Sequence, residues 1–113
     1  YDFENGWKTI EQIAGMHQFK ATIKTHLGPH HVDANSHLVR TLQNIYQEHT
    51  GEEPELLAIG GGTYARALKN AVAFGPLFPG REDIAHQKDE YIIIEDLLKT
   101  TAMYAQAIYE LTR

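Results

Sequence analysis

The sequence predicts an α/β protein built from two pieces of different architecture, which meet near residues 28–35. Before this seam, the pattern indicates one helix followed by one amphipathic strand. After it, helical patterns alternate with two short apolar runs, as in an open α/β sheet. The composition is typical of a folded chain, because 42% of the 113 residues are hydrophobic and 22% are charged.

The first piece begins with a helix predicted over residues 3–14, whose apolar side chains share one face. Gly15 is a candidate C-cap for that helix. Residues 18–27 then alternate apolar and polar side chains, which is typical of a long strand with one buried face. The Gly28–Pro29 pair ends this strand.

The second piece begins with an amphipathic helix predicted from Ser36 to about His49, with Asn35 or Ser36 as its N-cap and Gly51 closing it. Its apolar positions recur at three-and-four spacing. They are Leu38, Val39, Leu42, Ile45 and Tyr46. Residues 56–59 follow as an apolar run without polar alternation, so we expect an interior strand covered on both faces.

The last third of the chain contains a second buried strand candidate at residues 71–74 and a long loop over residues 75–90. A helix is predicted over residues 95–111, with Glu95 and Asp96 near its positive end. The residues expected to face inward from this helix are Leu98, Ala102, Ala105 and Ile108 or Tyr109. Long loops in compact domains tend to carry function, so the loop is a candidate site.

Composition narrows the classes of function. The chain has no cysteine, so a metal ion would need histidine and carboxylate ligands. A net charge of -5 without a basic stripe gives nucleic acid little electrostatic reason to bind. No apolar stretch is long enough for a membrane span and no signal peptide is visible, so we expect a cytoplasmic protein.

Gly60, Gly61, Gly62 and Thr63 lie between the predicted strand at residues 56–59 and a short helix predicted over residues 64–70. Backbone N–H groups in such a turn can face an anionic or carbonyl ligand, and glycines allow close approach. The turn is neither a P-loop nor a dinucleotide fingerprint. A plain tight turn that requires positive φ angles is the alternative.

His86 lies in the long loop, between acidic residues on both sides. A loop histidine with a nearby carboxylate is a reasonable metal ligand, because the partner fixes the ring tautomer. The alternative is an ordinary surface histidine. No HExxH pair is present, and no other cluster completes a metal site within the chain. Neither cysteine nor a G-x-S-x-G serine offers a nucleophile, so metal-activated water is the simplest hydrolytic option.

Four motifs occur in a fixed order: GGGTYAR, FPG, AHQ-x-x-E and the EDL helix start. Together they resemble the C-terminal end of bacterial dipeptidases of the dipeptidase V type, which are relatives of carnosinase, aminoacylase and succinyl-diaminopimelate desuccinylase. The resemblance is close from about residue 30 to residue 113, and the ordered combination is more specific than any one motif.

The resemblance implies a zinc-peptidase-like catalytic domain of open α/β form, interrupted by a ferredoxin-like lid domain. Residues 1–32 would be the last helix and strand of the lid, and residues 33–113 would be the C-terminal part of the catalytic domain. His86 would be the family's final metal ligand, and Gly60, Gly61, Gly62 and Thr63 would line the substrate side of the pocket. Two divalent metal ions are implied, with zinc first and manganese or cobalt as alternatives.

The resemblance also implies what this chain lacks. The other metal ligands, the glutamate general base, the lid histidine and the lid arginine would lie upstream, so we expect no catalytic residue here. The substrate would be a dipeptide hydrolysed by metal-bound water, and we expect the isolated chain to be inactive and to self-associate. The alternatives are deacylation or desuccinylation of N-acyl amino acids, or a non-catalytic module that binds small anions.

Overall fold

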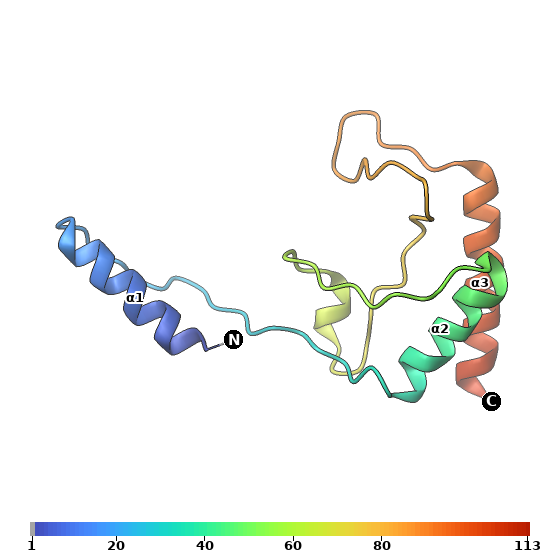
Figure 1. Cartoon of the computed structure of the whole chain (residues 1–113), viewed down its shortest axis with the longest axis horizontal. Coiled ribbons are helices and arrows are strands. Elements are labelled where there is room, and N and C mark those ends of the chain that lie inside the picture. The colour runs from blue at the N-terminus through green and yellow to red at the C-terminus, as the bar shows by residue number, and fades with distance from the viewer. Residues whose placement is uncertain (1) are drawn as a thin grey trace.

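The computed structural model describes residues 2–113, which form three α-helices and one 3-10 helix. Their bounds are α1 Phe3–Met16, α2 His37–Thr50, η1 Tyr64–Ala67 and α3 Ile94–Thr112. Figure 1 shows α1 apart from the other helices, joined to α2 by a long coil. The radius of gyration is 19.1 Å, whereas a compact domain of this length has about 13 Å. The chain is therefore far more open than a self-contained domain.

α1 begins at a capped end, where the Asp2 side chain accepts a hydrogen bond from the Asn5 backbone N–H at 3.2 Å. It ends later than predicted, because the helical turn continues through Gly15 to Met16 and His17 is the C-cap. The prediction of Gly15 as C-cap is therefore wrong. No residue of α1 is fully buried. Its contact outside the helix is the Phe3 ring, which stacks on the His26 ring with centroids 3.6 Å apart.

α2 confirms the sequence prediction closely. Ser36 is the N-cap, and its hydroxyl accepts a hydrogen bond from the Val39 N–H at 3.3 Å. Gly51 is the C-cap in the left-handed conformation, with φ 74°, and its N–H donates to the Gln47 carbonyl at 2.8 Å. The predicted apolar face is the one that is buried, with Ile45 only 2% exposed.

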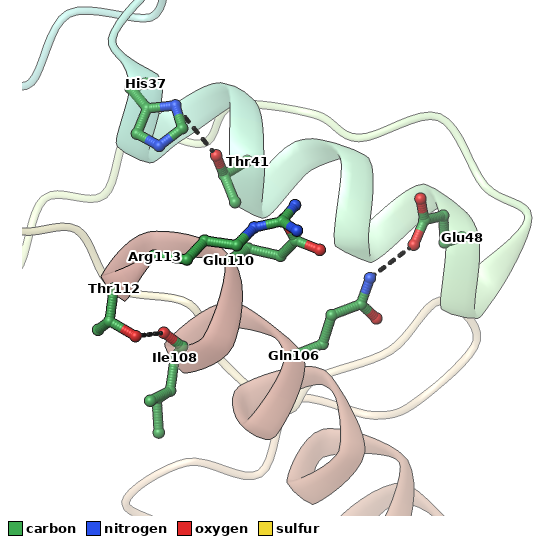
Figure 2. Close-up of polar contacts among 8 residues, drawn as sticks. All are labelled: His37, Thr41, Glu48, Gln106, Ile108, Glu110, Thr112 and Arg113. Atoms are coloured by element: carbon green, nitrogen blue, oxygen red, sulfur yellow. Dashed lines mark hydrogen bonds and ion pairs between the residues drawn. The ribbon is translucent and has the colours of Figure 1, made fainter.

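α2 and α3 are the pair of helices that pack together, and the small core lies between them. Its buried members are Leu42, Ile45, Phe78, Met103 and Ala107. Polar contacts reinforce the packing at its edge. Figure 2 shows the Gln106 amide N–H of α3 donating to the Glu48 carboxylate of α2 at 2.7 Å. The carbonyl oxygen of the same amide lies 2.8 Å from Nε2 of His49.

α3 turns a different face to α2 from the one predicted. The buried residues of α3 are Asp96, Thr100, Met103 and Ala107. The predicted inward residues Leu98, Ile108 and Tyr109 are instead 66%, 66% and 63% exposed, and Ala102 and Ala105 are also exposed. The prediction was wrong because α3 carries two apolar faces, and α2 occupies the one that also contains polar residues.

None of the predicted strands forms: residues 18–27, 56–59 and 71–74 contain no β-strand, and neither does any other part of residues 2–113. A strand exists only through hydrogen bonds to a neighbouring strand, and these segments find no such partner within residues 2–113. Val72 and Phe74 pack against the α2–α3 core from an irregular backbone instead. The α/β sheet is thus absent from the described residues, which also include no helix able to cross a membrane.

Candidate metal-binding loop and glycine turn

The long segment between η1 and α3 packs on the core before His86, first at Val72 and Phe74 and then at Phe78. Phe78 is only 8% exposed and belongs to the α2–α3 core. The chain then turns at Gly80, which has φ +76°, a conformation that favours glycine. The N–H of Arg81 donates to the Phe78 carbonyl at 3.1 Å, which closes the turn.

An ion pair fixes the same segment to the start of α3. Nε and a terminal nitrogen of Arg81 donate to the two carboxylate oxygens of Asp96 at 2.7 and 3.0 Å. These hydrogen bonds hold the pKa of the Asp96 carboxyl below its ordinary value of 3.8. The sequence placed Asp96 only as an acidic residue at a helix start. An acidic residue and an arginine 15 positions apart give no periodic signal, so the pair was missed.

His86 lies in the middle of the loop, in a small turn that the loop builds by itself. Its φ is 64°, in the left-handed region, and its N–H donates to the Glu90 carboxylate at 3.1 Å. The Gln87 N–H and side-chain amide donate to the carbonyls of Ile84 and Asp83, each at 3.0 Å. The turn is thus held by neighbours in sequence.

The imidazole of His86 is exposed, and among residues 2–113 no hydrogen bond to its ring nitrogens is formed. The Glu90 carboxylate accepts a hydrogen bond from the backbone N–H of His86 and makes none with its ring. The carboxylate contact expected for the imidazole is therefore not formed by Glu90. The ring is chemically suited to hold a metal ion as a single donor. No group of three or more metal-ligating side chains comes together in the described part of the chain. A complete metal site would need donors from elsewhere.

The glycine turn has neither of the two predicted geometries, which were a turn at the start of a helix and a tight turn with positive φ angles. Gly60, Gly61 and Gly62 are exposed and none has a positive φ, so the left-handed tight turn is wrong. The helix predicted over residues 64–70 is a single 3-10 turn, and Thr63 makes no side-chain cap hydrogen bond. Thr63 itself is half-buried. Anion binding by a helix N-terminus therefore has no support here.

Arg66 of η1 connects the glycine turn to the seam between the two predicted pieces. Its guanidinium donates to the Gly28 carbonyl at 2.8 Å, and its side chain lies 3.1 Å from where a Cβ on Gly62 would be. His30 lies beside the same region, with Nε2 2.6 Å from the Ala71 carbonyl oxygen. The glycine turn and the loop of His86 occupy separate places along the trace (Figure 1), and no hydrogen bond joins them within residues 2–113.

The chain belongs to peptidase family M20/M25/M40, whose model matches residues 5–110. Members of this family are generally metal-dependent peptidases. This confirms the resemblance drawn from the four motifs.

The similar proteins share one kind of name. The chain is 66% identical over 85 residues to "Putative dipeptidase YtjP" of Bacillus subtilis (strain 168), which covers 75% of the chain and 18% of that protein. A "Putative dipeptidase" of Staphylococcus epidermidis is 51% identical over 83 residues, 74% of the chain and 18% of the relative. A third, from Staphylococcus aureus (strain USA300), is 38% identical over 111 residues, covering 98% of the chain and 24% of the relative. The chain thus spans only 18–24% of the length of these curated relatives.

Proposed function

We propose that this chain is part of a metal-dependent dipeptidase, in which His86 donates a ring nitrogen to one of two divalent metal ions. The observation that carries the proposal is an exposed imidazole at the centre of an anchored loop, in a chain that belongs to a peptidase family. The names of the similar proteins support a dipeptide as the substrate. They give no support to N-acyl amino acids, and the short η1 gives none to an anion-binding module.

Within this proposal, the metal ions, zinc first and manganese or cobalt as alternatives, supply an activated water and polarise the peptide carbonyl. His86 holds one ion and moves no proton. Gly60, Gly61, Gly62 and Thr63 lie beside the substrate, where glycines without side chains leave room for it. The general base and the remaining ligands belong to the rest of the polypeptide, which is the main partner of this chain.

The proposal extends to the domains in which the two parts of the chain lie. We propose that residues 1–32 belong to a lid domain and residues 33–113 to an α/β catalytic domain, with strands completed by the rest of the polypeptide. Leu56, Leu57 and Ile59 are 56%, 80% and 64% exposed. An apolar run left open in this way is suited to a central strand that gains neighbours on both sides.

The test compares two histidine variants of the whole polypeptide that contains this chain. His86→Ala should remove one bound ion per molecule, measured by metal analysis, and reduce dipeptide hydrolysis, because a ligand is lost. His37→Ala is the control, since this exposed histidine of α2 lies outside the proposed site. Full metal content in His86→Ala would contradict the proposal. Faster turnover of N-acyl amino acids than of dipeptides would show that the reaction is deacylation and not dipeptide hydrolysis.

A second measurement uses the 113-residue chain alone. We expect no peptidase activity when zinc or manganese is added, because one imidazole donor cannot hold two ions in a catalytic cage. Turnover by the purified chain would show that the residues needed for catalysis are present in it.

A further inference from the structure

We propose that Arg81 and Asp96 are positioning residues for the imidazole of His86, because their ion pair closes the base of the loop that carries it. The proposal rests on the proposed function, in which that imidazole binds a metal ion. Neither residue would touch the metal or the substrate. Their effect would be to fix where the loop presents His86 relative to the α2–α3 core.

The Arg81–Asp96 ion pair is bidentate. Both carboxylate oxygens of Asp96 accept from the planar guanidinium of Arg81, at 2.7 and 3.0 Å. Two parallel charge-assisted hydrogen bonds fix orientation as well as distance. Asp96 is only 6% exposed, so it is held within the packed part of the protein and not on a mobile surface.

Both residues of the ion pair lie next to packed parts of the protein. Arg81 follows Phe78, which is buried in the core and lies under Lys99, whose Nζ is 5.0 Å from the ring centroid. Asp96 lies in the first turn of α3, on the face that packs toward α2. The positions at which the loop leaves and rejoins the core are therefore both fixed.

Between the two anchors the loop has little other support. Residues 82–92 are exposed, apart from half-buried Ile84. The hydrogen bonds around His86 join residues of the loop to one another, namely Asp83, Ile84, Ala85, His86, Gln87 and Glu90. Because these few exposed bonds are its only support within residues 2–113, both the position of the turn and how often it opens depend on how its base is held. The Arg81–Asp96 pair is therefore the contact that sets the position of His86.

The test compares Arg81→Gln with Lys88→Gln. Both variants remove one positive charge from the same segment, but Lys88 is 93% exposed at its side chain and its nearest carboxylate oxygen, on Asp89, is 3.9 Å away. Hydrogen exchange of the hydrogen-bonded amides of Ala85, His86 and Gln87 should rise about tenfold in Arg81→Gln, while exchange of the buried part of α3 stays unchanged. In the whole polypeptide, the dissociation constant for Co²⁺ as the probe metal should rise about 10- to 100-fold. Lys88→Gln should change neither quantity by more than about twofold.

Further variants keep the test decisive if Arg81→Gln loses its fold. Arg81→Gln combined with Asp96→Asn leaves no unpaired buried charge, so it should fold and show the same loop exchange and Co²⁺ affinity as the single variant. Arg81→Lys keeps the charge but loses the fork, and we expect an intermediate effect. If the folded double variant, or Arg81→Lys, behaves like the unaltered protein in both measurements, the positioning role is refuted.

Failure of this inference differs from failure of the proposed function. If His86→Ala keeps its full metal content, the proposed function is wrong, whatever Arg81→Gln does. If His86→Ala loses an ion but Arg81→Gln keeps normal loop exchange and Co²⁺ affinity, only the positioning role is wrong.

Discussion

Replacement of Phe78 tests whether the loop is anchored by packing. Phe78 is 8% exposed, so a smaller side chain at this position loses most of the stabilisation that comes from burial of the ring. Truncation of a buried Phe to Ala costs about 3–5 kcal/mol, from lost transfer free energy and the cavity left behind. Phe78→Leu retains most of the volume and should cost about 1–1.5 kcal/mol. The graded pair shows whether the loss follows the volume removed.

The assay is urea unfolding of the 113-residue chain, followed by far-UV circular dichroism. With a denaturant slope of about 2 kcal/mol per M, Phe78→Leu should lower the midpoint by about 0.5–0.8 M, and Phe78→Ala by about 1.5–2.5 M. Leu77→Ala is the matched control, because the adjacent Leu77 is 54% exposed. An exposed site of this kind should change stability by no more than about 0.5 kcal/mol.

Two results would refute the reasoning. Equal effects of Leu77→Ala and Phe78→Ala would show that the core does not distinguish the two side chains. A midpoint unchanged in Phe78→Ala would show that the loop is not anchored through this ring.

Three further outcomes are expected. The folded pKa of Asp96 lies below its ordinary value because of the Arg81 hydrogen bonds, so the unfolded state binds more protons between the two values. The stabilisation should be complete above the ordinary value of 3.8 and be lost as pH falls through the lower folded value, and acid unfolding of Asp96→Asn should lack this loss. Gly51→Ala should cost about 1 kcal/mol in urea unfolding because φ is 74°, whereas Gly15→Ala, inside α1, should increase helical dichroism. The chain should self-associate in light scattering, and Leu98→Glu should reduce this, because that side chain is 66% exposed; a monomer at all concentrations would contradict it.

Local signals were sufficient for α2. A serine N-cap, three-and-four apolar spacing and a closing glycine all act within one helix, and each is found at its predicted residue. The predicted metal ligand and glycine turn were also located on irregular segments, as expected. Their roles in binding stay predictions, because both depend on groups outside this chain.

Sequence patterns predicted less where the structure depends on a neighbouring element. Residues 56–59 have the composition of an interior strand, but no neighbour in the described part of the chain supplies the hydrogen bonds, so no strand forms. The inward face predicted for α3 consists of apolar residues alone, whereas α2 packs on the face with Asp96 and Thr100. Periodicity shows that an apolar face exists but not which of two faces a particular neighbour covers.

The placement of the single tryptophan affects how unfolding can be followed. Trp7 lies in α1, which contributes no buried residue and stands apart from the core. Its intrinsic fluorescence will therefore report on the local surroundings of α1 and will stay nearly constant while α2 and α3 separate. Tyrosine emission has a better position, because Tyr46 of α2 packs against the core and the ring of Tyr104 of α3 lies beside that of Phe74.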